Sequence, residues 1–328
     1  ARRLAEVIAD TEPMVEREVA RILPDAGDKP LTIEELTLCR TTANEAAHRQ
    51  AGYAHLGYQT LKLQALAERI SGLITALSAR AGVILQEDDV IEAIRTFLRD
   101  AAVVEPGKGG SSKAGASARP ERIIAFLKLL DVDYRVRRLR FVVRKLNGFY
   151  QSRAHEVAAQ KPDDLDALKR ELYEQIDKLQ SCWSAQSYPF EIAEAAAELA
   201  VGGPGGIDLS QLEAVMEQIG QHMGLVSLDR LHDDVFAVMS FTYLVPMLRR
   251  ELTRAYIGFA FYDLITLPVF QRNDFSEVNE TLVDRISPRD ASSLLDEGFQ
   301  LKGSALNTFG AFFNRSWREH DYLWGRLT

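Results

Sequence analysis

Apolar residues recur every three or four positions along most of the chain, which is the spacing of amphipathic helices. The pattern predicts one or two opening helices interrupted at Pro13, followed by a long helical region over residues 33–77. Thr32 and Glu35 form a capping box at the start of that region. Asp88 and Asp89 are placed to open the next helix, because carboxylates stabilise a helix N-terminus.

The second half of the chain continues the same pattern. Pro162 marks the start of another amphipathic helix, and a longer apolar helical region runs over residues 228–267, bent or restarted at Pro246. The apolar run within that region is too short to span a bilayer. Pro268 and the polar run at residues 271–274 are expected to end it.

Two segments depart from helical spacing. Residues 105–120 are rich in Gly, Ser, Ala and Lys and predict a mobile loop, with no complete phosphate-loop motif. Residues 281–286 are the one candidate strand, which would place Leu282, Asp284 and Ile286 on one side. The sequence therefore predicts a mainly α, bundle-like fold over residues 1–328, one large domain with at most a short β element.

Composition adds few constraints. The 328 residues are 46% hydrophobic and 26% charged, a normal globular balance, and the net charge of −8 argues against a general nucleic-acid binder. Two cysteines give neither a disulfide framework nor a metal-ligand spacing, which suits a reducing cytoplasm.

One helix, over residues 130–150, is strongly basic. Its apolar stripe is surrounded by six cations: Arg135, Arg137, Arg138, Arg140, Arg144 and Lys145. Such a helix can face the phosphates of an anionic membrane or nucleic acid. Asp131 and Asp133 at its start, and the acidic excess of the chain, favour instead a charge network within the protein.

The segment of residues 303–327 is unusually rich in aromatic side chains set among charges. As a helix it aligns Phe309, Phe313, Trp317 and Trp324 on one face. It is expected to close a hydrophobic core, and the alternative is a docking surface for another domain or a ligand.

Catalytic motifs are incomplete in this sequence. Gly-x-Ser-x-Gly does not occur, and the string that begins at His155 lacks the second histidine of a zinc protease. His232, Asp233 and Asp234 are interpreted as the cap of a helix rather than as metal ligands. We expect no cofactor and no metal.

Four segments, taken in order, resemble a known family. Residues 51–63, 131–150, 262–288 and 316–327 are similar to the helical region of unknown function that follows the catalytic domain in a group of bacterial patatin-like proteins. Patatin-like proteins are lipid acyl hydrolases with a Ser-Asp dyad, and neither dyad motif is present here. The family pattern continues past WGRL with Asp where this chain has Thr328, which favours a fragment of a longer protein.

The resemblance implies a non-catalytic accessory domain that supports or covers a patatin-like catalytic domain of the same protein, in the cytoplasm or at the periphery of a membrane. One alternative is a self-contained helical module that binds a protein or an anionic membrane through residues 135–145. Another is an enzyme whose site assembles from distant residues. The candidate interaction residues are Arg135, Arg138, Asp263, Arg285, Asp290, Trp317, Arg318, Asp321, Trp324 and Arg326.

Overall fold

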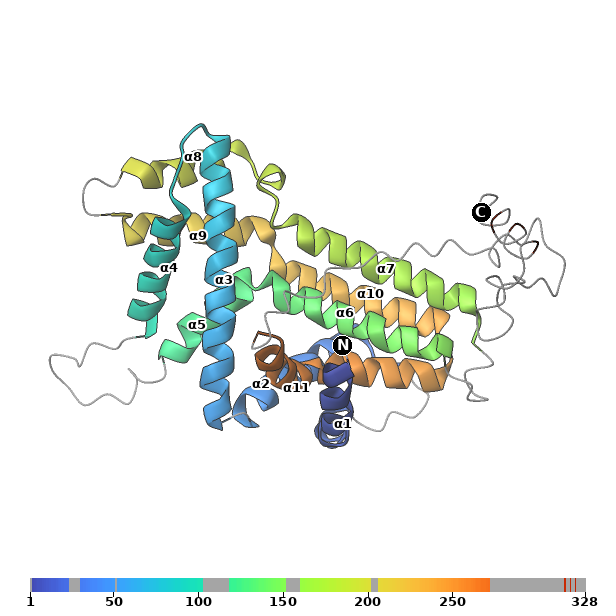
Figure 1. Ribbon diagram of the computed structural model, residues 1–328. Helices are drawn as coiled ribbons and strands as arrows, with labels where there is room; N and C mark the ends of the chain where they lie inside the picture. Colours follow the sequence, from blue (N-terminus) through green and yellow to red (C-terminus); the bar gives the residue numbers. More distant parts are fainter. Residues whose placement is uncertain are drawn as a thin grey trace, which may run out of the picture. The chain divides into compact units, whose positions relative to one another are not determined.

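Every regular element in the described part of the chain is a helix, which confirms the mainly α prediction (Figure 1). The computed structural model describes residues 2–23, 30–50, 52–102, 118–151, 160–201 and 206–271, with Ser316, Glu319 and Tyr322. The α-helices are α1 (Arg2–Ile22), α2 (Ile33–Gln50), α3 (Gly52–Arg80), α4 (Glu87–Ala102), α5 (Ala118–Leu130), α6 (Val132–Gln151), α7 (Pro162–Ser181), α8 (Phe190–Glu198), α9 (Leu209–Met223), α10 (Leu225–Tyr243) and α11 (Pro246–Gln271).

The chain divides into two compact units, Ala1–Asp274 and Phe275–Thr328. All of the helices named above belong to the first unit. The predicted strand at residues 281–286 lies outside the described residues. So does the predicted loop at 105–120, except that α5 already begins at residue 118.

Three predicted boundaries are wrong. Pro13 and Pro268 lie inside α1 and α11, although each removes a backbone hydrogen bond. Side-chain packing outweighs that cost, since Val15 and Val19 are buried next to Pro13. The region predicted over residues 33–77 is divided between α2 and α3, and the second helix starts at Gly52, the residue type least favourable to a helix after proline.

Within the first unit, α6, α7, α10 and α11 lie side by side, and α3 runs across their direction (Figure 1). α4, α8 and α9 gather around the end of α3 that is distant from α2 (Figure 1). One continuous core joins the two groups, and its fully buried members include Ile74, Leu139, Leu168 and Ile219. This arrangement places α6 in contact with both α7 and α11.

Glycine permits one close approach that matters for the site. A Cβ atom at Gly258 of α11 would lie 2.9 Å from a methyl carbon of Val19 and 3.1 Å from one of Val15. The missing side chain therefore lets α1 pack directly on α11.

Candidate functional site

Part of the basic helix α6 faces the interior, while Arg144 on the same helix is exposed. Arg135 and Arg138 are only 5% and 1% exposed, although arginine is rarely fully buried unless it is paired. Both guanidinium groups reach Asp229 of α10: Arg138 Nη2 donates to Oδ1 at 2.9 Å and Arg135 Nη2 to Oδ2 at 2.7 Å. Burial alone would raise the pKa of the Asp229 carboxyl, but Arg138 and Arg135 outweigh burial and hold that pKa well below its ordinary value. Asp229 is therefore a carboxylate at neutral pH.

Asp233, one turn further along α10, has no exposed surface and is the anion of a second cluster. Arg40 of α2 donates two hydrogen bonds to it, from Nε to Oδ1 at 2.8 Å and from Nη2 to Oδ2 at 2.8 Å. Thr37 and Tyr256 each donate a hydroxyl hydrogen bond, at 2.9 and 2.7 Å. Five short donor contacts leave no acceptor position of this carboxylate open to a ligand.

The two clusters meet at Arg138. Its guanidinium carbon lies 5.0 Å from the centre of the Tyr256 ring, a cation–π contact, and Tyr256 in turn stacks on Phe236. His232 is buried beside them, and neither ring nitrogen has a hydrogen-bond partner among the described residues. Burial and then Arg138 lower the pKa of His232 to about 3, so the ring is neutral under physiological conditions.

A third cluster joins α3, α6 and α11. Asp263 is 1% exposed, and its carboxylate accepts hydrogen bonds from Arg137 Nε at 2.7 Å and Nη2 at 3.0 Å. This is the bidentate geometry of a strong ion pair. The Tyr58 hydroxyl donates to the same carboxylate at 2.6 Å. Burial and then the Asp263 charge raise the pKa of Tyr58 well above its ordinary value, which keeps the phenol protonated.

Lys62 of α3 extends this cluster to the start of α6. Its Nζ lies 2.5 Å from Asp131 Oδ2 and 4.3 Å from the centre of the Tyr134 ring. Asp131 also accepts the backbone N–H of Tyr134 at 2.9 Å, so it caps α6 as its position in the sequence predicted. Burial opposes ionisation of Asp131, but Lys62 and Arg137 outweigh it and lower the pKa of the carboxyl.

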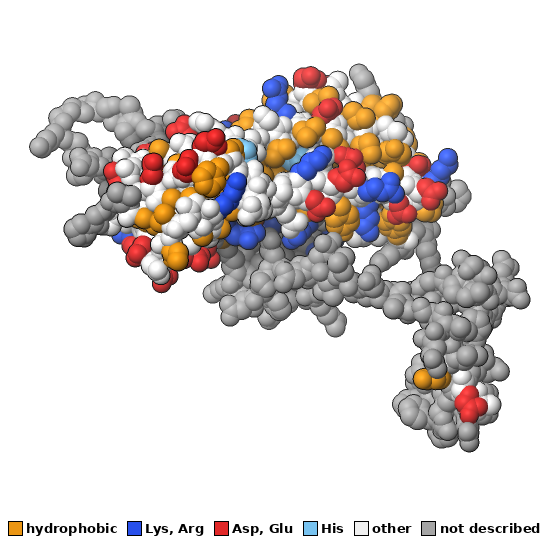
Figure 2. Space-filling model, turned by 90° about the horizontal axis from the view of Figure 1, so that it is seen from above, with side chains coloured by type: hydrophobic (Ala, Val, Ile, Leu, Met, Phe, Trp, Pro, Cys, Tyr) orange, Lys and Arg blue, Asp and Glu red, His pale blue; other side chains and the backbone are white. Residues whose placement is uncertain are grey.

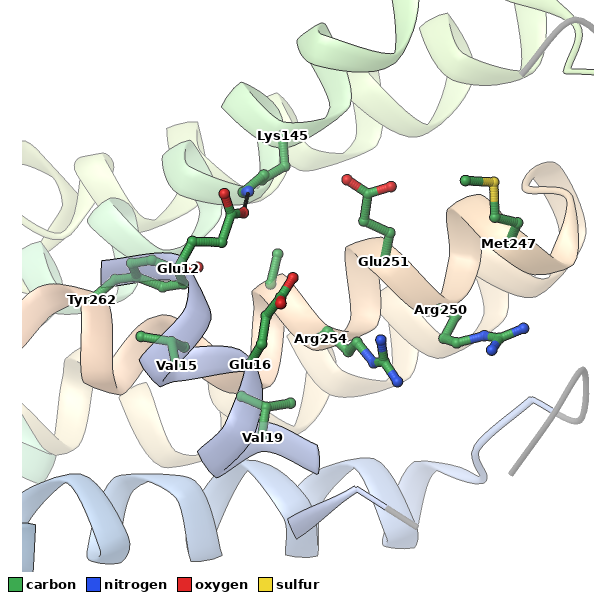
Figure 3. A pocket seen from close by; sticks show the side chains of 11 residues that line it. Glu12, Val15, Glu16, Val19, Lys145, Met247, Arg250, Glu251, Arg254 and Tyr262 are labelled. Carbon is green, nitrogen blue, oxygen red and sulfur yellow. Dashed lines mark hydrogen bonds and ion pairs between the residues drawn. The ribbon is translucent and has the colours of Figure 1, made fainter. Parts of the chain in front are cut away.

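The described surface of the same helices contains a cavity of about 330 Å³ between α1, α6 and α11 (Figure 3). Its lining combines apolar and charged side chains: Glu12, Val15, Glu16, Val19, Lys145, Met247, Arg250, Glu251, Arg254, Ala255 and Tyr262. Lys145 of α6 and Glu12 of α1 form an ion pair across one side of it (Figure 3). The volume lies in the range of small-molecule sites.

The structure brings together three of the residues singled out in the sequence. Arg135 and Arg138 share Asp229, and Asp263 lies in the neighbouring cluster. Internal pairing of the basic helix is confirmed for these arginines, for Arg137 and for Lys145. The other candidates lie outside the described residues: Arg285, Asp290, Trp317, Arg318, Asp321, Trp324 and Arg326.

The interpretation of His232, Asp233 and Asp234 as a helix cap is wrong. They lie in the middle of α10, where Asp233 serves as a buried counter-ion rather than as a cap. The sequence held a signal that pointed to this role: Asp229 and Asp233 are four residues apart, on the face of α10 that also carries Phe236. Arg40, Lys62 and Tyr58 were not singled out, because their partners lie far away in the sequence.

The geometry defines a helical domain with a buried charge network, in which carboxylates on α10 and α11 meet cations on α2 and α6. A family model described as a protein of unknown function (DUF3376) matches residues 193–328. The matched part of the chain is thus a domain of unknown function. No curated protein and no solved structure matches the chain.

The matched range and the compact unit have different boundaries. Residue 193 lies inside α8, in the middle of the unit Ala1–Asp274. The carboxylates of Asp229, Asp233 and Asp263 fall within the match, while the arginines that neutralise them precede it. The matched residues therefore depend on the preceding helices for charge compensation.

Proposed function

We propose that this chain is a non-catalytic helical domain that accompanies a patatin-like lipid acyl hydrolase, supporting or covering a catalytic domain of the same protein. One observation carries the proposal. Three of the four segments that resemble the helical region of patatin-like proteins meet at one buried cluster: Tyr58 from residues 51–63, Arg137 from 131–150 and Asp263 from 262–288.

The chemistry of that cluster favours a supporting role. Tyr58, Arg137 and Asp263 satisfy one another and are largely withdrawn from solvent. A general base or nucleophile must contact a substrate. These three side chains bond to one another instead and thereby connect α3, α6 and α11. This shared contact explains why the three segments occur together in one sequence, and the explanation requires no catalytic role for them.

The membrane-binding alternative requires the cations of α6 at the surface. Arg135, Arg137 and Arg138 instead form ion pairs within the bundle. On the face shown in Figure 2, acidic and basic side chains are interspersed. None of the described helices is long and apolar enough to cross a bilayer. These observations favour the accessory role over binding of anionic lipid through α6.

The test begins with the reading frame that encodes the chain. The proposal expects a Gly-x-Ser-x-Gly serine and a later Asp-Gly pair outside these residues, and acyl-ester hydrolysis by the encoded protein that is lost when that serine is replaced by alanine. A reading frame without those motifs would refute it. So would hydrolysis that survives loss of the serine but fails on Asp263→Asn. Sedimentation with anionic liposomes at two salt concentrations tests the alternative, which requires salt-sensitive binding.

A further inference from the structure

Large apolar side chains reach the surface on α10 more often than on any other helix in the described part of the chain. They are Val226, Leu231, Val238 and Phe241, which are 60%, 39%, 52% and 57% exposed. A single exposed apolar residue is ordinary, but several on one helix indicate a surface that packs against another one. Because these side chains remain exposed, no described element covers this face of α10.

Four exposed residues of α10 form one row along the helix, at intervals of four positions. They are Val226, Arg230, Asp234 and Val238. Residues four apart lie one turn from each other on the same side of a helix, so their side chains form a continuous ridge. The ridge has an apolar residue at each end and two opposite charges in the middle. Leu231 lies beside the middle of the ridge, in the neighbouring row.

The two charges of the ridge have no counter-ion within the described residues. Asp229 and Asp233, on the inner side of the same helix, pair with arginines of α6 and α2. Arg230 and Asp234 form no ion pair there, with each other or with another helix. Their order along the helix, with the cation before the anion, is the less favourable one for a pair within a helix. Both charges are therefore available to a second molecule.

A second copy of the chain supplies both counter-ions at once. We consider two α10 ridges that pack side by side in antiparallel directions, related by a two-fold axis midway between Arg230 and Asp234. Arg230 of each copy then faces Asp234 of the other, and Val226 faces Val238. Leu231 lies next to the axis, close to its own counterpart. A parallel alignment would instead place like charges opposite each other, which is unfavourable.

We propose that the exposed face of α10 is the interface of a homodimer, in which α10 packs antiparallel against α10 of a second copy of this chain. Two reciprocal ion pairs between Arg230 and Asp234 fix the register, and the valines and Leu231 supply the apolar contacts. One helix face is small beside a standard interface of about 1,600 Å², so the dissociation constant should lie in the micromolar range. The inference rests on the surface of α10 and is independent of the accessory role proposed above.

Sedimentation velocity of residues 1–328 over a series of protein concentrations tests the proposal. We expect a reversible equilibrium between monomer and dimer. Arg230→Glu should weaken the dimer by at least about tenfold, because it places a carboxylate opposite Asp234 at two symmetry-related points. The exchanged pair Arg230→Asp with Asp234→Arg should restore the affinity to within about threefold of wild type, since both ion pairs form again with their signs reversed. A monomer at every concentration, or an exchanged pair no tighter than Arg230→Glu, would overturn the proposal.

Matched variants separate a specific interface from a general effect of charge. Arg95→Glu and Asp100→Arg change the same charges at exposed positions on α4 and should dimerise as the wild type does. The α10 variants should unfold at the wild-type urea concentration in dilute solution, because Arg230 and Asp234 pair with nothing described within one chain. Equal weakening of the dimer by Arg95→Glu and Arg230→Glu would overturn the assignment to α10.

Cysteine cross-linking with a short bismaleimide tests the antiparallel direction, in a chain that carries Cys182→Ser. Val226→Cys mixed with Val238→Cys should give a covalent dimer, because these positions face each other across the interface. Val226→Cys alone should not, because its two copies lie about 18 Å apart along the helices. Cross-linking of Val226→Cys alone but not of the mixture would show a parallel pair, and cross-linking of neither would show another interface. Both results would overturn the proposal.

Discussion

Replacing Asp233 by asparagine should cost the protein much of its stability. The carboxylate has no exposed surface and receives hydrogen bonds from Arg40, Thr37 and Tyr256. Asparagine keeps the shape but removes the charge and turns one acceptor into a donor. The Arg40 side chain, 11% exposed, is then left as a buried cation without a counter-ion. Removing one partner of such a pair costs about 3–5 kcal/mol, a large part of the roughly 5–15 kcal/mol of a typical domain.

Urea unfolding, followed by circular dichroism and tryptophan fluorescence, measures this loss. Asp234→Asn is the matched control, because the neighbouring aspartate is exposed on the same helix and should change stability by no more than about 0.5 kcal/mol. The double variant Arg40→Met with Asp233→Asn should lose less than the sum of the two single losses, since both charges of the pair are then gone. Equal unfolding midpoints for Asp233→Asn and Asp234→Asn would refute the buried-network reasoning.

Three further predictions follow from the packing. His232, whose pKa is lowered to about 3 in the folded protein, takes up a proton on unfolding at pH values between about 3 and its ordinary pKa, so it contributes a loss of stability as the pH falls from 7 to 4. His232→Leu should remove up to about 3 kcal/mol of that loss, and a pH dependence identical to wild type would contradict the assignment. Gly258→Ala should destabilise by about 1–3 kcal/mol, because its methyl group would meet Val15 and Val19. Gly148→Ala, with open space around it, should stabilise by about 0.5–1 kcal/mol, and a gain at both positions in thermal melts would argue against close packing of α1 on α11. Residues 193–328 expressed alone should lack a cooperative unfolding transition, because Asp229, Asp233 and Asp263 lose their partners Arg40, Arg135, Arg137 and Arg138; a sharp transition in calorimetry would show that the matched range folds by itself.

Local patterns in the sequence were sufficient to predict the helices but not their partners. The apolar spacing and the Thr32–Glu35 capping box located α2, and both reciprocal hydrogen bonds of that box are present. The helix ends predicted at Pro13 and Pro268 were wrong, because tertiary packing compensates for the backbone hydrogen bond that each proline removes. The basic helix was recognised as a candidate for internal pairing from its composition alone.

The partners of the basic helix could not be predicted from the sequence. Arg40 and Asp233 are separated by 193 residues, and Arg137 and Asp263 by 126. Nothing local distinguishes a carboxylate that meets an arginine across the bundle from one that faces water. The cavity was missed for the same reason: Glu16 on α1 and Tyr262 on α11 become neighbours only when Gly258 lets those helices touch.

The central claim is that these helices support a hydrolase and contribute no nucleophile to it. The most direct measurement is the rate of acyl-ester hydrolysis by the complete encoded protein, compared between Asp233→Asn and Asp234→Asn, with residues 1–328 alone assayed alongside. We predict a reduced rate for Asp233→Asn only, and no turnover by the isolated chain. Undiminished hydrolysis by a destabilised Asp233→Asn protein, or turnover by residues 1–328 alone, would contradict the claim.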